Sequence, residues 1–249
     1  MIDEQLLRYS RQIMLPDMDI AGQQKLVDAN VLIVGMGGLG CPVGMYLAAA
    51  GVGHLILADD DTVEITNLQR QIAHSQADIG SSKVESVAET LKDLNPKVRI
   101  TAMNQRLEEK DLDNQMSTVD VVVDASDNFT TRFAINRACS KTKTPLVSGA
   151  AIRMEGQVTV FDPRDAQSPC YQCLYTEGDD ESASCSANGV LAPIVGIIGS
   201  VQALETIKVI TGIGKPLTGR LLLLDGKTMQ WREMKLPRDE NCPVCSFSK

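Results

Sequence analysis

Short apolar runs alternate with helix-like stretches over the first 160 residues of the chain. Within 83–94, for example, the apolar residues fall on one helical face, and Asn95-Pro96 ends the pattern. Strands that alternate with helices pair in parallel, because parallel neighbours require crossover connections. The pattern therefore predicts a doubly wound, mostly parallel α/β sheet. The expected strands are 31–34, 54–58, 98–103, 119–123 and 145–148, with further helices ending at 50 and spanning 131–140.

The last third of the chain has a different pattern. A polar stretch over 162–188 precedes a long apolar helix pattern at 193–212. A polar segment of this length inside a compact domain is usually functional or disordered, so we expect a long crossover loop there. Three strand patterns flank these segments, and the last of them alternates in the way that suits an antiparallel edge strand. They are 157–161, 220–225 and 229–236.

Composition narrows the class of protein. Hydrophobic residues make up 43% of the chain and charged residues 22%, which is typical of a soluble globular protein. No charge-free apolar run approaches the roughly 20 residues of a membrane span, so we expect no membrane partner. A net charge of −8 without any basic stretch argues against a nucleic-acid partner. Seven cysteines without an export signal predict a reducing, cytoplasmic location, where thiols serve as metal ligands or nucleophiles.

A glycine-rich turn at residues 35–40 follows the first expected strand and begins a helix. Its sequence, GMGGLG, fits the G-x-G-x-x-G pattern, whose backbone can approach a phosphate at the positive end of a helix. Asp59 follows the second strand, where a carboxylate can bind ribose hydroxyls. These two features predict a Rossmann-like nucleotide site, and an NAD-linked oxidoreductase is the first hypothesis.

Charged residues after this turn favour a nucleotide triphosphate with Mg²⁺ over NAD. Residues 59–61 are three consecutive aspartates, more than ribose recognition needs. Arg70 and Lys83 add cations that suit phosphates, although each alone would be interpreted as a solvated surface charge. Asp127 follows the fourth strand at the edge where ligands bind, and it could bind a metal there or simply form an Asp-Asn turn.

Four of the seven cysteines form two C-x-x-C pairs. Two such pairs supply four thiolates for one tetrahedral Zn²⁺ with no open position, so we expect a structural zinc site that ties the polar loop to the C-terminal segment. Cys41 and Cys139 lie in helix patterns and are expected in the core. Cys185, in the polar loop, is either a candidate nucleophile or an uninvolved thiol. The expected zinc ligands are Cys170, Cys173, Cys242 and Cys245.

Together these motifs resemble the HesA/MoeB/ThiF family of sulfur-carrier adenylyltransferases, which is related to the ubiquitin-activating E1 domains. The resemblance implies a single adenylation domain over 1–249, with a nucleotide-binding part at about 1–160 and a zinc-tied part at about 161–249. Thr66 departs from the serine more usual in the family but keeps the hydroxyl. The segments that carry the resemblance, in family order, are 8–13, 35–40, 59–61, 66–71, Lys83, 126–128, 147–151 and the two cysteine pairs.

The resemblance implies ATP-dependent adenylation of the C-terminal Gly-Gly carboxylate of a small ubiquitin-like sulfur-carrier protein, with release of pyrophosphate. The carboxylate itself attacks, so no side-chain nucleophile is needed, which fits a sequence without a catalytic triad. The resemblance further implies a homodimer and allows a sulfur-donating enzyme as a partner. The implied catalytic residues are Arg11, acting in the neighbouring subunit, Arg70, Lys83 and Asp127, with Cys185 a candidate for carrier chemistry. The implied nucleotide ligands are Gly38, Asp59, Asp61, Thr66, Asn67, Leu68, Gln69, Arg70, Lys83, Asp127 and Asn128, with Asp127 also serving Mg²⁺.

The pathway is a separate question. We favour adenylation of the carrier for molybdopterin biosynthesis, with the thiamine-pathway carrier as the alternative. A non-catalytic scaffold that only binds a carrier is a third hypothesis, against which the presence of Arg70, Lys83 and Asp127 argues. The segments closer to the molybdopterin branch are 147–157 and 232–236, and those closer to the thiamine branch are 22–26, 58–61 and 230–232.

Overall fold

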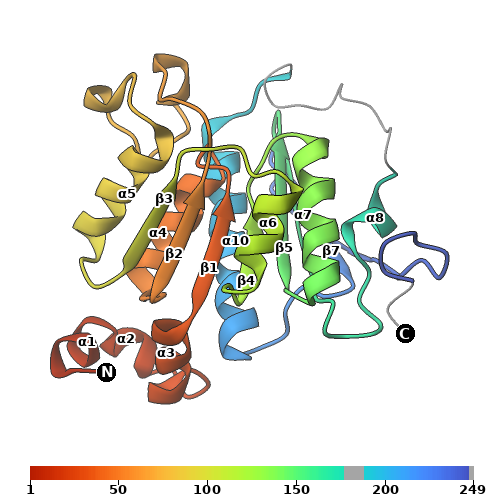
Figure 1. The fold of residues 1–249 in the computed structure, drawn as a ribbon, viewed down its shortest axis with the longest axis horizontal. Coiled ribbons are helices and arrows are strands. Elements are labelled where there is room, and N and C mark those ends of the chain that lie inside the picture. The colour runs from red at the N-terminus through yellow and green to blue at the C-terminus, as the bar shows by residue number, and fades with distance from the viewer. Residues whose placement is uncertain (177–187, 247–249) are drawn as a thin grey trace.

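The computed structural model describes residues 1–176 and 188–246, and its main element is one twisted sheet. The strand order is β3-β2-β1-β4-β5-β6-β7-β8, with helices on both faces (Figure 1). Strands β3 to β5 in this order pair in parallel, and β6, β7 and β8 are antiparallel additions, so the predicted sheet is confirmed. The strands are β1 (Asn30–Val34), β2 (His54–Ala58), β3 (Arg99–Met103), β4 (Val121–Asp124), β5 (Leu146–Ile152), β6 (Glu155–Phe161), β7 (Arg220–Asp225) and β8 (Gln230–Lys235).

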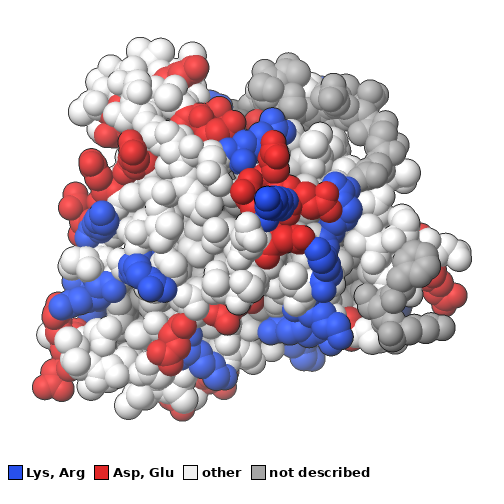
Figure 2. Space-filling model, viewed as in Figure 1, with Lys and Arg blue, Asp and Glu red and all other residues white. Residues whose placement is uncertain are grey.

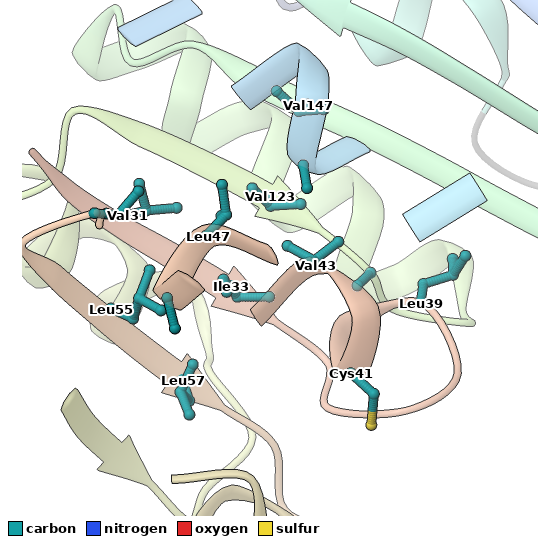
Figure 3. Close-up of a cluster of buried hydrophobic side chains, with 14 of the residues drawn as sticks. Val31, Ile33, Leu39, Cys41, Val43, Leu47, Leu55, Leu57, Val123 and Val147 are labelled. Atoms are coloured by element: carbon teal, nitrogen blue, oxygen red, sulfur yellow. The ribbon is translucent and has the colours of Figure 1, made fainter. Parts of the chain in front are cut away.

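The helices form two layers around the sheet. In β1, Val31 and Ile33 belong to the buried cluster under α4, α5 and α10, and Figure 3 shows part of this cluster. Leu32 and Val34 point the other way, into the cluster under α6 and α7. A strand buried on both faces needs apolar residues at every position, which explains the unbroken apolar run. The helices are α1 (Asp3–Arg8), α2 (Ser10–Ile13), α3 (Asp19–Asp28), α4 (Gly40–Ala50), α5 (Lys83–Leu94), α6 (Glu109–Met116), α7 (Phe129–Thr142), α8 (Tyr171–Leu174) and α10 (Ala192–Thr211), with short 3-10 turns η1 (Ile65–Asn67) and η2 (Gln76–Asp78).

Helix α10 lies in the core of the protein. By length and composition it could cross a membrane, but 56% of its most apolar window is buried inside the protein. It packs against α4 and against β5 and β6, and closes the face of the sheet opposite α7. Its apolar character is therefore accounted for by packing within the described part of the chain.

Candidate active site

A cavity of about 1150 Å³ opens at the carboxyl ends of the parallel strands. The strand order reverses between β1 and β4, and ligands of open α/β sheets bind at such a point. The cavity brings together most of the nucleotide ligands expected from the sequence. Those that line it are Gly38, Asp59, Asp61, Asn67, Arg70, Lys83, Asp127 and Asn128. The expected ligands Thr66, Leu68 and Gln69 lie in the same segment but are not part of this lining.

The glycine turn forms one wall of the cavity, and its glycines serve two purposes. Gly35 has φ +95°, and a Cβ there would lie 2.7 Å from the Ala125 carbonyl oxygen, so only glycine lets β1 and β4 end so close together. A Cβ on Gly40 would lie 1.8 Å from the Gly35 carbonyl oxygen. Gly37 differs, because its Cβ would meet only Gln71 Nε2, at 3.5 Å. The backbone at Gly37 is therefore open to the cavity, as a phosphate site requires.

Asp59 is fixed beside this turn at the end of β2. Its Oδ2 accepts a 2.6 Å hydrogen bond from Met36 N–H, and its Oδ1 accepts one of 2.9 Å from Asp61 N–H. Burial raises the pKa of Asp59, while the Lys83 charge and these N–H groups act in the opposite direction. Each carboxylate oxygen can accept a second hydrogen bond, so Asp59 can receive ribose hydroxyls without losing its backbone contacts.

Two expected cations, Lys83 and Arg70, reach the cavity from different elements. Lys83 is the first residue of α5, and its buried Nζ donates to Asp61 Oδ2 at 2.7 Å. Arg70 follows η1, and its Nη1 donates to the Thr66 carbonyl at 3.0 Å. Figure 2 shows acidic and basic side chains interspersed over the face it presents, rather than one continuous basic patch. The positive charge of the cavity therefore comes from individual side chains. In addition to Lys83 and Arg70, the cavity lining includes Arg106, Arg132 and Arg232.

A buried pair, Asp124 and Arg132, lies at the end of β4 and was not predicted from the sequence. Asp124 accepts hydrogen bonds from Ser126 N–H at 3.0 Å and from the Ser126 hydroxyl at 2.6 Å. Arg132, on α7, lies 3.9 Å from Asp124 and donates to the Ser126 carbonyl at 2.7 Å. The pair fixes the loop that carries Asp127, which is itself exposed. Two features of the sequence could have indicated this pair: an Asp at the end of a strand, and an Arg one turn after the helix-capping Asn128. The Asn128 side chain accepts a hydrogen bond from Thr131 N–H.

Arg11 lies away from the cavity of its own chain. It sits on α2 at the edge of a shallow groove that includes Tyr46 and Leu204, both largely exposed. Helix α2 contacts α1 and α3, at the opposite end of the sheet from the glycine turn (Figure 1). Arg11 therefore cannot be counted among the groups that this chain places around its own cavity.

The four cysteines of the two C-x-x-C pairs come together beside α8. The Sγ–Sγ distances are 3.6 Å for Cys170–Cys242, 3.6 Å for Cys173–Cys245 and 4.0 Å for Cys170–Cys173, and all four sulfurs lie within 4.8 Å of one another. A tetrahedral zinc ion with bonds of about 2.3 Å separates its sulfurs by about 3.8 Å, so the cluster fits zinc. The sulfur–sulfur hydrogen bond with Cys170 and hydrogen bonds from backbone N–H groups lower the pKa of Cys173 to about 5, which favours the thiolate that a metal binds.

The remaining cysteines separate into two groups. Cys41 and Cys139 are buried, as predicted, and burial raises the pKa of the Cys41 thiol to about 12. Thiols in such surroundings are inert, because the thiolate is the reactive form. Cys185 lies outside the described residues.

The residues 59–61 form a second cluster of possible metal ligands. Each of these three aspartates offers a carboxylate oxygen within 4.8 Å of the others, and Asp60 and Asp61 are exposed. Carboxylate oxygens are the ligands that Mg²⁺ takes in proteins, usually together with substrate phosphates. The chemistry of this donor set is therefore compatible with Mg²⁺ brought by a nucleotide.

Comparison with known proteins gives consistent similarities over the whole chain. The model of the ThiF family matches residues 9–244. The molybdopterin-synthase adenylyltransferase of Escherichia coli strain K12 is 49% identical over 243 residues, covering 98% of this chain and 97% of that protein. The sulfur carrier protein ThiS adenylyltransferase of the same organism is 46% identical over 248 residues, covering 100% of this chain and 98% of that protein. Among solved structures, E. coli MccB with ATP has a TM-score of 0.83 at 25% identity, covering 96% of this chain and 73% of that one.

Proposed function

Because the chain belongs to the ThiF family, we propose that it adenylates the C-terminal carboxylate of a small ubiquitin-like sulfur-carrier protein with ATP. One observation carries the proposal: the cavity at the β1–β4 switch point joins an open glycine turn, a fixed Asp59 and the cations Arg70 and Lys83. The two E. coli relatives, both named adenylyltransferases, support the same reaction class. The similarity extends over nearly the full length of both relatives, so it covers the whole chain and not the nucleotide site alone.

The reaction joins a carboxylate oxygen of the carrier to the α-phosphorus of ATP and releases pyrophosphate. Both reactants are anions, so the barrier is largely electrostatic repulsion, which placed cations and alignment reduce. In the proposed mechanism Gly37 and Gly38 approach the phosphates, Asp59 binds the ribose, and Lys83 and Arg70 neutralise developing charge. Mg²⁺ would supply further neutralisation, and we assign it to Asp127.

Two features complete the proposed assembly. We propose that Cys170, Cys173, Cys242 and Cys245 bind one structural Zn²⁺, which would join α8 to the C-terminal segment. We also propose a homodimer in which Arg11 reaches the neighbouring cavity, supported by its position at an exposed apolar groove rather than at its own cavity. An apolar groove with a charged rim suits contact with a second copy.

For the carrier, we propose the protein used in molybdopterin biosynthesis, with the thiamine-pathway carrier as the alternative. The identities to the two E. coli relatives differ by only three percentage points, so sequence similarity alone distinguishes the two pathways weakly. We further propose that the protein acts in the cytoplasm, where reduced thiols can serve as zinc ligands.

The test is ATP–pyrophosphate exchange with each carrier in turn. We expect exchange that depends on a carrier with an intact Gly-Gly terminus. The kcat/KM should be higher for the molybdopterin-pathway carrier than for the thiamine-pathway carrier. A higher value for the thiamine-pathway carrier would transfer the assignment to that branch. No exchange with either carrier, together with thermal stabilisation by NAD but not by ATP, would refute adenylation.

A further inference from the structure

Asn136 is a buried polar residue of α7 that the proposed reaction does not use. It is 1% exposed and is not part of the cavity lining. Its Oδ1 accepts a 2.8 Å hydrogen bond from Tyr171 N–H, and its Nδ2 donates to Cys170 Sγ at 3.6 Å. An amide nitrogen cannot accept a hydrogen bond from Tyr171 N–H, so this bond determines that the nitrogen is the end that faces the sulfur.

The sulfurs of the cysteine cluster lie where negative charge is unfavourable unless donors surround it. Cys170 and Cys242 are buried, and four thiolates around one Zn²⁺ carry net negative charge. Cys173 Sγ accepts from Cys170 N–H at 3.4 Å and from Asp239 N–H at 3.5 Å, which are backbone groups. Asn136 differs from these donors because it is a side chain on another element, so a substitution can remove its hydrogen bond alone.

The helix that carries Asn136 also forms part of the wall of the nucleotide cavity. Helix α8 lies against α7 (Figure 1). Phe129 and Arg132 line the cavity from the start of α7, and Arg132 lies one turn before Asn136. The ring of Tyr171 packs against that of Phe133, with the two ring centroids 5.3 Å apart. The contacts of Asn136 therefore join the cysteine cluster to a helix of the active site.

We propose that Asn136 is a positioning residue of the zinc site, which donates from Nδ2 to the Cys170 thiolate and holds that sulfur in the orientation that the metal requires. A donated N–H favours the thiolate over the thiol, and hydrogen bonds of this kind orient the ligands of metal sites. The hydrogen bond from Tyr171 N–H prevents the amide from rotating, so the donor is already in place before the metal binds. This inference rests on the proposed zinc site and deepens it, and it does not depend on adenylation.

Transfer of zinc from the full chain to a competing chelator tests the proposal. Asn136→Leu keeps a side chain of similar size and removes both polar atoms. We expect its zinc affinity to fall about 10- to 100-fold, as the loss of such a hydrogen bond typically causes. The matched control is Asn95→Leu, because Asn95 is also buried and its Nδ2 donates to Tyr9 Oη and the Ala48 carbonyl, not to the cluster.

Substitution of the zinc by Co²⁺ distinguishes the hydrogen bond from a purely structural role of Asn136. Co²⁺ binds the same thiolates, and its sulfur-to-metal charge-transfer band moves to lower energy when a thiolate loses a hydrogen bond. We expect this shift in Asn136→Leu and an unshifted band in Asn95→Leu, even where the Tm of the control falls further. If Asn136→Leu does not fold, Asn136→Ala is judged by the same criteria.

Three results would overturn the inference. They are wild-type zinc affinity in Asn136→Leu, an equal loss of zinc affinity in Asn95→Leu, and lowered affinity in Asn136→Leu with an unshifted cobalt band. A wild-type chain that binds no zinc would refute the zinc site itself, and this inference with it, and would leave the proposed adenylation standing.

Discussion

The Lys83 ammonium lies 2.7 Å from the Asp61 carboxylate, and the two side chains differ sharply in exposure, at 8% and 67%. The cation is thus enclosed in the cavity wall, while its partner faces solvent. A pair of this kind contributes little to stability, because water solvates the exposed carboxylate. What the pair does is fix the ammonium group at the start of α5, where it borders the nucleotide cavity.

Replacing this cation should separate activity from stability. We expect Lys83→Met to lower carrier-dependent pyrophosphate exchange by about 10²- to 10³-fold, as removal of one placed stabilising group typically does. Its free energy of unfolding should change by less than about 1 kcal/mol, since Asp61 remains solvated. Exchange rates and urea denaturation measure the two effects, with Lys92→Met on the exposed side of the same helix as control. Near-wild-type exchange in Lys83→Met would be incompatible with the assigned role.

The glycine turn allows a paired test of backbone function. In Gly40→Ala the new Cβ would lie 1.8 Å from the Gly35 carbonyl oxygen, so we expect loss of several kcal/mol of stability or no folding. In Gly37→Ala the Cβ would meet only Gln71 Nε2 at 3.5 Å, so the fold should persist while ATP binding weakens about tenfold or more. Thermal denaturation and ATP titration distinguish the two variants. Normal ATP affinity in Gly37→Ala would show that phosphates do not approach this backbone.

Metal analysis tests the cysteine cluster. The purified protein should contain about one zinc ion per chain, and Cys242→Ser should lose it because the serine hydroxyl is a poor zinc ligand. Since binding energy of a structural metal contributes to folding, a chelator should lower the Tm of the wild type. Cys139→Ala is the control, because Cys139 lies in the core outside the cluster and its loss should leave the zinc content unchanged. Zinc-free protein with full stability would contradict the prediction.

His74 should make stability depend on pH. Burial lowers its pKa below 6.5, and it contacts Ser86 Oγ at 2.8 Å and the Met36 carbonyl at 3.3 Å as a neutral ring. Lys83 also lowers the pKa, whereas the hydrogen bond to the Met36 carbonyl and the charges of Asp78 and Asp59 raise it. Below pH 6.5 the unfolded chain binds a proton that folded His74 does not, so stability falls as pH falls through this value.

The variant His74→Gln should lower this pH dependence by up to about 1.4 kcal/mol per pH unit in that window. Urea denaturation between pH 5 and 7.5 or so measures the slope, since the relevant titration is centred near 6.5. The chain has a second histidine, His54, whose pKa is also lowered, by burial and by Arg99. His54→Gln therefore measures the part of the pH dependence that His54 contributes. An unchanged slope in His74→Gln would show that protonation of His74 does not destabilise the fold.

Much of the fold was predictable because its central strands are buried on both faces. The strand His54–Ala58 and the helix Lys83–Leu94 have the predicted bounds, since their apolar residues follow the period of a single element. Helix α6 was not predicted, because only Leu112 and Met116 of its residues are buried. Strand β5 continues past the predicted end at 148 through Gly149, which the pattern could not assign to a strand. A Cβ at Gly149 would lie 2.3 Å from the Gln202 side chain, so small residues there reflect packing under α10.

The site was predictable where a local motif carries it and not where tertiary contacts create it. The glycine turn, Asp59 and the cysteine pairs have fixed spacing, so they were found from the sequence. Arg132 was missed because its partner Asp124 lies on another element, and the pair is visible only when β4 and α7 are placed together.

The most direct measurement is the mass of the carrier after incubation with this protein, ATP and Mg²⁺, with pyrophosphate removed by hydrolysis. We expect a carrier that is heavier by one adenylyl group, and the added group should be labile to hydroxylamine, as an acyl phosphate is. A carrier that lacks its last glycine should gain no mass, because its new terminal carboxylate would end one residue short of the α-phosphate. An unmodified wild-type carrier under these conditions, with ATP bound by the protein, would contradict carrier adenylation.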